Sequence, residues 1–399
     1  MLEIIIAGEG TGNMTQEVRD AMNESEIIFA NERFKNLVDE KKFIALKNFS
    51  DAFNFIDNES SEHSKILFLV SGDPCLYSLL PLVKKRFTQA KIRVLSGISS
   101  LQVICSHACE SWNDAKILSG HGRFIKAGTL LNAIERNRIT ILFCDRDFSP
   151  QWICSKIHEN ISGIIEVFIG ERLGSDYEKV YNGSPEKFIA REFAQPAIIL
   201  IRNENFYSPA RFRLRDKDFL RSESVHMTHE LIRAAILDRL ELESNSILWD
   251  IGAGTGSISI SAAHEHNDIE VHAIECKHEA IKLISRNIKK FHLHNIILHE
   301  GRALDSVKNL PAPSHVFIGG SGGELSEILE HIASLNKSIR LVIECVTLET
   351  FNTAFNFMHD MKDFEALQIS ASVSKSIAGS LSLTLMKANN PVMVLCANL

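Results

Sequence analysis

The stretch SILWDIGAGTGSIS, residues 246–259, constrains the fold of this chain more than any other. An apolar run ends in Asp250, glycines follow at positions 252, 254 and 256, and a helical pattern then begins. Glycines directly after a buried strand remove Cβ atoms and permit positive φ, so backbone N–H groups can approach a ligand. Because ligands bind at the carboxyl ends of the strands in a parallel sheet, the pattern predicts the first strand–loop–helix unit of an α/β domain.

The spacing of these glycines indicates the kind of ligand. A dinucleotide fingerprint is G-x-G-x-x-G, whereas the third glycine here comes one position early. The next apolar run ends in Glu275, where a carboxylate can accept hydrogen bonds from both hydroxyls of a ribose. A D-x-G-x-G-x-G loop with an acidic residue closing the next strand is typical of an S-adenosylmethionine site, which we therefore expect here.

Short apolar runs alternate with helical patterns along the whole chain, which favours an α/β architecture. At 399 residues the chain is too long for one ordinary core. Residues 202–224 are charged and lack an apolar period, so we expect domains at 1–205 and 225–399 joined by a linker at 206–224. The expected strands are 3–7, 26–30, 66–70, 92–95, 139–144, 164–169 and 196–201 in the first half, and 246–250, 270–275, 296–299, 315–318, 339–344 and a final strand within 391–399 in the second.

Local patterns after the linker give two further expectations. Thr228 is placed to cap a helix whose apolar face contains Ile232, Ile236 and Leu240. Arg233 in that helix needs no partner if it is solvated, and we expect it to be so.

Composition excludes several classes of protein. The 43 Lys and Arg residues stand against 50 Asp and Glu, and a net charge of -7 provides no general field for holding nucleic acid. No stretch reaches the roughly 18 apolar residues of a membrane span, and the apolar run at the start is too short for a signal peptide. The eight cysteines form no CxxC pair or zinc-type spacing. We expect a cytoplasmic protein with reduced cysteines, no metal site, and neither a nucleic acid nor a membrane as its partner.

The second half resembles the carbon-15 methylases and decarboxylases of corrin-ring biosynthesis. The resemblance covers residues 225–399 and rests on LWDIGAGTGSISISAA, VHAIE, FIGGSGG and VTLETF. It implies a Rossmann-like class I S-adenosylmethionine methyltransferase fold. The cofactor-binding residues that it implies are Thr228, Asp250, Gly252, Ala253, Gly254, Thr255, Gly256, Glu275 and Ala303.

The string GGSGG at residues 319–323 is expected to form a nest of backbone N–H groups that binds carboxylates of the substrate. This hypothesis rests mostly on the resemblance, and a plain turn before the next helix is the alternative. The substrate-binding residues expected in this loop are Gly319, Gly320, Ser321 and Gly322.

The first half resembles the tetrapyrrole methylase family, in particular its carbon-5 methylases. The matching strings are GEGTGNMT, LVSGDPCLYSLL, LSGISSLQ and SGHGR, within residues 1–201. The resemblance implies a fold of two lobes, with a second S-adenosylmethionine site lined by Gly8, Gly10, Gly72, Asp73, Ser99 and Ser100. Arg33 and Arg123 are the expected substrate contacts, and His121 is the expected general base.

Together the two resemblances imply one fused enzyme of cobalamin biosynthesis. It is expected to methylate the tetrapyrrole precorrin-6Y, or its cobalt form, at carbons 5 and 15, and to release carbon dioxide from the acetate on carbon 12, giving precorrin-8. Each methylation needs a general base, and the family leads us to expect a homo-oligomer.

Two alternatives stay open. An RNA methyltransferase would share the fold of the second half, but the net charge and the FIGGSGG string, in place of N/D-P-P-Y/F, count against it. A non-catalytic S-adenosylmethionine-binding scaffold is the other, and the two uneroded glycine loops count against it.

Overall fold

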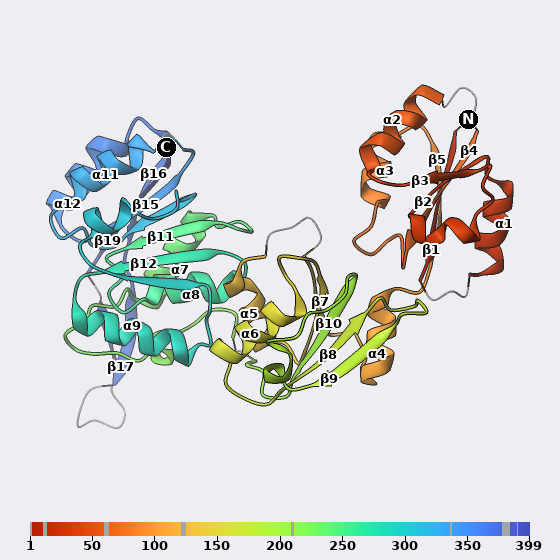
Figure 1. Cartoon of the computed structure of the whole chain (residues 1–399). Helices are drawn as coiled ribbons and strands as arrows, with labels where there is room; N and C mark the ends of the chain where they lie inside the picture. The colour runs from red at the N-terminus through yellow and green to blue at the C-terminus, as the bar shows by residue number, and fades with distance from the viewer. Residues whose placement is uncertain are drawn as a thin grey trace. The chain divides into compact units, whose positions relative to one another are not determined.

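The chain forms two compact α/β units, drawn in Figure 1. The first comprises Met1–Phe124 and Asn137–Phe206, and the second comprises Ile125–Arg136 and Tyr207–Leu399. The computed structural model describes residues 2–10, 14–59, 64–120, 125–208, 211–335, 337–376, 384–388 and 390–399. The segment 125–136 thus clusters with the second unit, and the domain ranges expected from the sequence stay a prediction.

A five-stranded parallel sheet forms the beginning of the first unit, in the order β3-β2-β4-β1-β5. The two central strands, β1 and β4, are almost entirely apolar because helices cover both faces of the sheet. The elements are β1 (Glu3–Glu9), α1 (Gln16–Glu24), β2 (Ile27–Ala30), a 3₁₀ helix (Glu32–Leu37), β3 (Phe43–Ala45), α2 (Phe49–Glu59), β4 (Lys65–Ser71), α3 (Leu80–Arg86) and β5 (Lys91–Leu95).

A second five-stranded sheet, in the order β6-β7-β10-β8-β9, completes the first unit. Only the pair β6–β7 is parallel, and the other neighbours in this sheet are antiparallel. Its elements are α4 (Ser100–Ala108), β6 (Lys116–Ser119), β7 (Ile139–Cys144), α6 (Pro150–Asn160), β8 (Ile165–Glu171), β9 (Lys179–Gly183), a 3₁₀ helix (Pro185–Phe188) and β10 (Ala197–Asn203).

The second unit is built on a seven-stranded sheet in the order β13-β12-β11-β14-β15-β19-β16. The first five strands of this order are parallel, and β19 runs antiparallel to both β15 and β16. Apolar clusters fill both faces. The elements are α7 (Glu230–Leu240), β11 (Ile247–Ile251), α8 (Ser257–Glu265), β12 (Glu270–Glu275), α9 (His278–Lys290), β13 (Ile296–Glu300), α10 (Ala303–Val307), β14 (His315–Ile318), α11 (Leu325–Ser334), β15 (Arg340–Cys345), α12 (Leu348–Met358), β16 (Lys362–Ile369) and β19 (Val392–Asn398).

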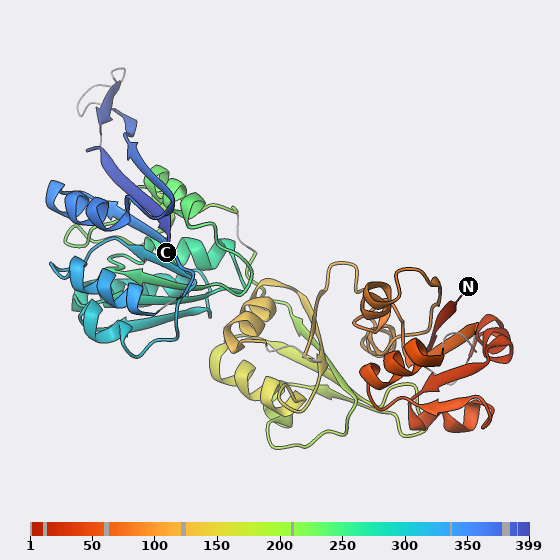
Figure 2. The same ribbon diagram turned by 90° about the horizontal axis from the view of Figure 1, so that it is seen from above.

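Two further strands, β17 (Ser372–Ser376) and β18 (Thr384–Ala388), form a separate antiparallel ribbon. The ribbon extends away from the seven-stranded sheet of the same unit, as Figures 1 and 2 show. Every described side chain of β18 is exposed, including Leu385 and Met386.

Helix α5 (Ala127–Arg136) joins the second unit through a set of polar contacts. Asn132 accepts a hydrogen bond from the backbone N–H of His294 at 2.8 Å, and the buried carboxylate of Glu135 binds His292. Arg136 donates to the backbone oxygen of His264 at 2.9 Å. The second unit is therefore assembled from two separate stretches of the chain.

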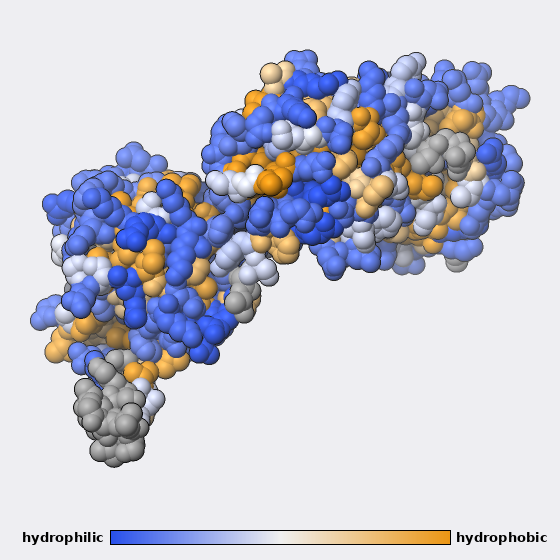
Figure 3. Space-filling model, turned by 90° about the horizontal axis from the view of Figure 1, so that it is seen from below, coloured by the Kyte–Doolittle hydropathy of each residue, from blue (hydrophilic) through white to orange (hydrophobic). Residues whose placement is uncertain are grey.

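The surface of the protein is mainly hydrophilic on the face drawn in Figure 3, where hydrophobic side chains lie in small separate groups. Within the described ranges, no helix is long and apolar enough to cross a membrane.

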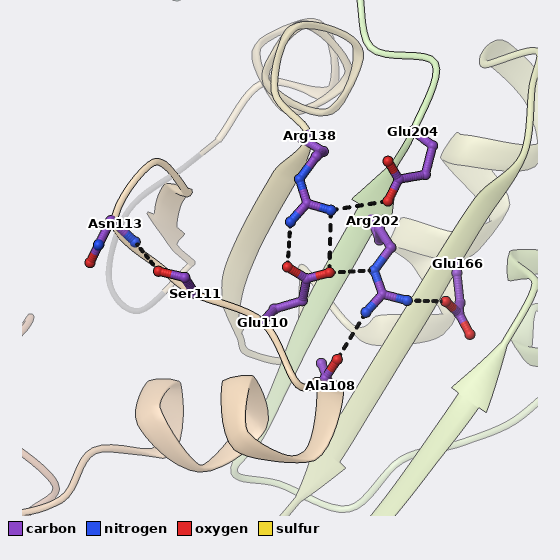
Figure 4. Close-up of polar contacts among 8 residues, drawn as sticks. All are labelled: Ala108, Glu110, Ser111, Asn113, Arg138, Glu166, Arg202 and Glu204. Carbon is purple, nitrogen blue, oxygen red and sulfur yellow. Dashed lines mark hydrogen bonds and ion pairs between the residues drawn. The ribbon is translucent and has the colours of Figure 1, made fainter.

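A network of ion pairs holds the end of α4 against the second sheet of the first unit (Figure 4). Glu110, with a side chain 12% exposed, binds Arg138 from β7's start and receives a 2.8 Å hydrogen bond from Arg202 of β10. Arg202 also bonds Glu166 and the backbone oxygen of Ala108. Although burial of Glu110 opposes its ionisation, hydrogen bonding and the charge of Arg138 and Arg202 outweigh it and lower the pKa of Glu110. This carboxylate is the centre of the network.

We expect Glu110→Gln to destabilise the first unit by about 1–3 kcal/mol, because it removes the charge that both guanidinium groups share. Glu204→Gln is the matched control, since Glu204 also binds Arg138 but its side chain is 56% exposed, and its effect should stay below about 1 kcal/mol. Since the pKa of Glu110 is lowered, its contribution is present above its ordinary pKa of 4.5 and is lost as the pH falls further. Urea unfolding that gives equal losses for both variants would contradict this assignment.

Candidate functional site

The glycine loop after β11 lies in direct backbone contact with the loop after β14. Gly252 has φ of 74°, and a Cβ atom there would lie 2.4 Å from the backbone oxygen of Gly320. The N–H groups of Gly319 and Gly320 donate to the backbone oxygen of Ile251 at 3.0 Å and 3.3 Å. Those two amides are therefore used within the protein. Ser321, which is half-buried, and Gly322, which is exposed, follow them in the same loop, and the substrate nest stays a prediction.

Glu275 closes β12 beside the same loop and is 7% exposed. One carboxylate oxygen accepts from the N–H of Gly254 at 2.8 Å, and the other accepts from the N–H groups of Cys276 and Lys277 at 2.8 Å and 2.9 Å. These three donors fix the orientation of the carboxylate. The oxygen that accepts from Gly254 keeps one lone pair, so the group can still accept a hydrogen bond from a hydroxyl.

Asp250 lies beneath the glycine loop and is 1% exposed. Its Oδ2 accepts from the N–H of Ser259 at 3.0 Å and from the hydroxyl of the same residue. Its Oδ1 and the hydroxyl of Thr255 are buried and have no hydrogen-bond partner among the described residues. Burial raises the pKa of Asp250 to about 6, against the lowering effect of Ser259, and the charges of Glu275 and Glu344 add to the increase.

The segment before α7 corrects two expectations. His229, not Thr228, caps α7, because its ring nitrogen accepts from the N–H of Leu231 at 3.3 Å. The Thr228 hydroxyl instead donates to Glu344 of β15 at 3.1 Å. Arg233 is 2% exposed rather than solvated, and its guanidinium donates to the backbone oxygens of Thr228 and Leu214 and to Asp216. The sequence pattern did not indicate either role.

The structure thus gathers most of the residues predicted for the C-terminal cofactor site at one edge of the sheet. The loop from Gly252 to Gly256 follows Asp250 directly, and Glu275 is bonded to it. His226, two residues before Thr228, lies against Gly254 in the same loop. Ala303 begins α10, which packs against β12 at the same edge. Glu344, which the sequence analysis missed, joins this group. The sequence contained a weak signal for it, because Glu344 closes the mainly apolar run IRLVIE as Glu275 closes EVHAIE.

The residues predicted for the N-terminal cofactor site also meet at strand ends. A Cβ atom on Gly8 would lie 2.2 Å from the backbone oxygen of Gly72, and one on Gly10 would lie 1.7 Å from the backbone oxygen of Ile98. Ser99 caps α4 and forms a capping box with Gln102. Asp73 accepts from the N–H of Cys75 at 2.7 Å. The loops after β1, β4 and β5 are therefore packed backbone to backbone.

Arg33 lies beside this group, in the 3₁₀ helix that follows β2. It donates to the hydroxyl of Ser71 at the end of β4, and its guanidinium lies 4.4 Å from the centre of the Phe34 ring. Glu9, at the end of β1, is 4% exposed and interacts electrostatically with Arg33. The other two predicted groups, His121 and Arg123, lie outside the described residues. In the part of the chain that is described, no cluster of His, Cys, Asp and Glu is suited to a metal ion.

Two family models match the chain, one on each half. The model described as tetrapyrrole (corrin/porphyrin) methylases matches residues 3–188, and the model described as precorrin methyltransferase domain matches residues 220–396. A Salmonella typhimurium cobalt-precorrin-6B C(15)-methyltransferase (decarboxylating) is 36% identical over 187 residues, which is 46% of this chain and 94% of the relative. A Sinorhizobium precorrin-6Y C(5,15)-methyltransferase [decarboxylating] is 27% identical over 290 residues, which is 72% of this chain and 69% of the relative.

Among solved structures, a Geobacter metallireducens precorrin-6y C5,15-methyltransferase is 32% identical and covers 45% of this chain and 93% of its own, with a TM-score of 0.41. The matches on the two halves agree on one class of protein, and the chain is a methyltransferase. More particularly, it belongs to the precorrin methyltransferase family, with a tetrapyrrole methylase domain in its N-terminal half.

The raised pKa of Asp250 predicts a pH dependence of stability in the free protein. Since the folded protein holds this proton up to about pH 6 and the unfolded chain releases it near 3.8, wild-type stability falls as the pH rises through that interval. Asp250→Asn cannot titrate, and its carbonyl oxygen can still accept from Ser259. We expect the difference in free energy of unfolding, variant minus wild type, to increase by about 1 kcal/mol between pH 5 and pH 7. A difference between the two proteins that does not change with pH in urea titrations would refute this assignment.

Proposed function

We propose that this chain methylates a corrin precursor, precorrin-6Y or its cobalt form, at carbons 5 and 15 and removes carbon dioxide from the acetate on carbon 12, giving precorrin-8. The observation that carries the proposal is the presence of both family matches on one chain, in the order tetrapyrrole methylase and then precorrin methyltransferase. The Sinorhizobium relative, whose name states both positions and the decarboxylation, matches across both halves. The domain ranges 1–205 and 225–399 form part of this proposal.

A Rossmann-like class I methyltransferase fold is proposed for the second half. Five parallel strands with helices on both faces and the antiparallel β19 inserted between β15 and β16 support it. In such a sheet the first strand is central and its loop lies at the point where the strand order reverses, which is where ligands bind. Here β11 is followed by Gly252, and β12 and β14 lie on its two sides.

The residues at this edge fit S-adenosylmethionine. Asp250 Oδ1 and Thr255 Oγ1 lie at the loop, buried and without a hydrogen-bond partner among the described residues, and Glu275 keeps one lone pair on the oxygen that accepts from Gly254. When bound, S-adenosylmethionine supplies a methyl group from its sulfonium and leaves as a neutral thioether. We assign Thr228, Asp250, Glu275, Ala303 and the loop from Gly252 to Gly256 to holding it. Their task is to orient the reacting groups and exclude water, and such positioning is worth roughly 7–11 kcal/mol in favourable cases.

A second S-adenosylmethionine site is proposed in the first half, one site for each domain. Gly8, Gly10, Gly72 and Ser99 supply its backbone frame, with Asp73 and Ser100 at the same strand ends. A substrate with several carboxylates needs cations, and Arg33, in the 3₁₀ helix after β2, and Arg123 are proposed for that role. In the second half, the loop formed by Gly319, Gly320, Ser321 and Gly322 is proposed to meet the substrate, and Gly320 and Gly322 are exposed. His121 stays the proposed base of the first site.

We also propose that the protein is a homo-oligomer. A two-stranded ribbon is marginally stable on its own in water, and the ribbon β17–β18 exposes Val373, Leu385 and Met386. A second copy of the chain would cover these side chains.

The two sites should be separable by substitution. Gly254 has a φ of 58°, which a residue with a side chain rarely adopts, and a Cβ atom there would lie 2.9 Å from the backbone oxygen of His226. In Gly254→Arg the loop after β11 therefore cannot keep its shape. We expect the rates of carbon-15 methylation and of decarboxylation to fall at least 100-fold. The rate of carbon-5 methylation should stay within threefold of that of the wild type. Product masses after incubation with S-adenosylmethionine and precorrin-6Y measure both.

Gly10→Arg is the reciprocal variant, because a Cβ there meets the backbone oxygen of Ile98. It should lose carbon-5 methylation and keep the activity at carbon 15. Calorimetric titration should count two equivalents of S-adenosylmethionine on the wild type and one on each variant. Loss of both methylations in both folded variants, or transfer of the methyl group to transfer RNA by the wild type, would overturn the proposal.

A further inference from the structure

Glu344 is the penultimate residue of β15, the third of three adjacent strands whose carboxyl ends frame the C-terminal site. Ile251, Ile318 and Ile343 are direct neighbours across β11, β14 and β15, so Glu344 follows at the level of Gly252 and Gly319. Side chains alternate along a strand, and Leu248 and Val342 both pack in the apolar cluster beneath α7 and α8. Asp250 and Glu344, each two residues further along, therefore face the same side of the sheet.

The surroundings of Glu344 suit a neutral carboxylic acid. The residue is 6% exposed, and of the residues that the structure describes, the one hydrogen-bond donor to it is the hydroxyl of Thr228 at 3.1 Å. No Lys or Arg within the described ranges forms an ion pair with it. Burial raises the pKa of Glu344, and its charge in turn contributes to the raised pKa of Asp250. A carboxyl group with a raised pKa is more readily protonated, and it can therefore serve as both a proton donor and a proton acceptor.

Thr228 is itself held in place, which fixes the Glu344 carboxyl. Arg233 donates to the backbone oxygen of Thr228 at 2.9 Å and to Asp216 Oδ1 at 3.0 Å. The buried guanidinium thereby anchors the segment that carries Thr228 to the start of α7. A preorganised hydroxyl on one carboxyl oxygen leaves the other oxygen for a second partner.

The proposed reaction requires one proton to move within the C-terminal site. Replacing the hydrogen on carbon 15 by a methyl group releases one proton. Loss of carbon dioxide from the carbon-12 acetate breaks the bond between the methylene and the carboxylate carbon, and the electron pair stays with the methylene and the conjugated ring. That methylene becomes a methyl group by taking up one proton. The proton released at carbon 15 therefore balances the proton gained at carbon 12.

We propose that Glu344 is the proton-transfer residue of the C-terminal site, donating to the methylene left by decarboxylation and accepting the proton released at carbon 15. This inference rests on the proposed function of that site. The neighbouring carboxylates are less suited to the task. Glu275 has both oxygens bonded to backbone N–H groups, and Asp250 is 1% exposed beneath the loop with one oxygen held by Ser259.

Glu344→Gln tests this directly, because glutamine keeps the shape and can still accept from Thr228 but cannot transfer a proton. We expect the rate of decarboxylation at carbon 12 to fall at least 100-fold, with carbon-5 methylation and the dissociation constant of S-adenosylmethionine within threefold of wild type. The pH profile of the residual decarboxylation should lose the limb that Glu344 contributes. Glu349→Gln, an exposed carboxylate five positions along the chain at the same edge, is the matched control and should match the wild type.

A readout without substrate separates this inference from the proposed function. In infrared spectra of the free protein, the wild type should show a neutral carboxyl signal that titrates above the ordinary pKa of 4.5 and that Glu344→Gln lacks. Retention of decarboxylation by the folded variant, or titration of Glu344 at or below its ordinary pKa, would overturn the role of Glu344. A wild type that transfers no methyl group to the tetrapyrrole would instead overturn the proposed function.

Discussion

Close contact between backbones at the strand ends is the constraint on which both candidate sites depend. In the second unit Gly252 leaves no room for a Cβ atom against Gly320, and in the first unit Gly8 leaves none against Gly72. A side chain at either position would separate loops that follow neighbouring strands. The glycines therefore do two things at once, because they permit the loop geometry and allow adjacent loops to form a continuous edge.

Buried carboxyl groups with different hydrogen-bond partners give that edge its chemical character in the second unit. Glu275 accepts three backbone N–H groups, Asp250 accepts from Ser259, and Glu344 accepts from Thr228. Donors to a carboxylate favour its charged form, whereas burial with few donors favours the neutral form. Three carboxyl groups within one edge are thus suited to different tasks by their surroundings rather than by residue type.

The sequence was most informative where a strand is buried on both faces. Strands such as β1, β7, β11 and β12 are buried at almost every position, and the structure has each of them within two residues of its expected end. The strands that were missed include β3, β6 and β9, which are short, and β16, whose residues are mostly half-exposed or exposed. Such strands are determined by pairing with their neighbours in the sheet, so the local sequence pattern indicates them poorly.

The candidate site could be predicted in its glycines and in Glu275, because strand context and spacing act locally. The roles of Arg233 and Glu344 could not, since each depends on contacts between distant segments. Arg233 joins α7 to Leu214 and Asp216, and Glu344 meets Thr228 across 116 positions of sequence. A solvated arginine and an arginine that fixes a loop look the same in a sequence.

The contribution of α5 to the second unit bears on how this chain can be divided. A single cut after residue 205 would separate α5 from the unit to which Asn132, Glu135 and Arg136 bind. The C-terminal fragment would then expose the surface around His292 and His294 that this helix covers. The His292 ring and the His294 N–H would lose their partners Glu135 and Asn132 and would be hydrated instead. No single cut in the chain therefore isolates the second unit, because α5 lies between β6 and β7 of the first unit.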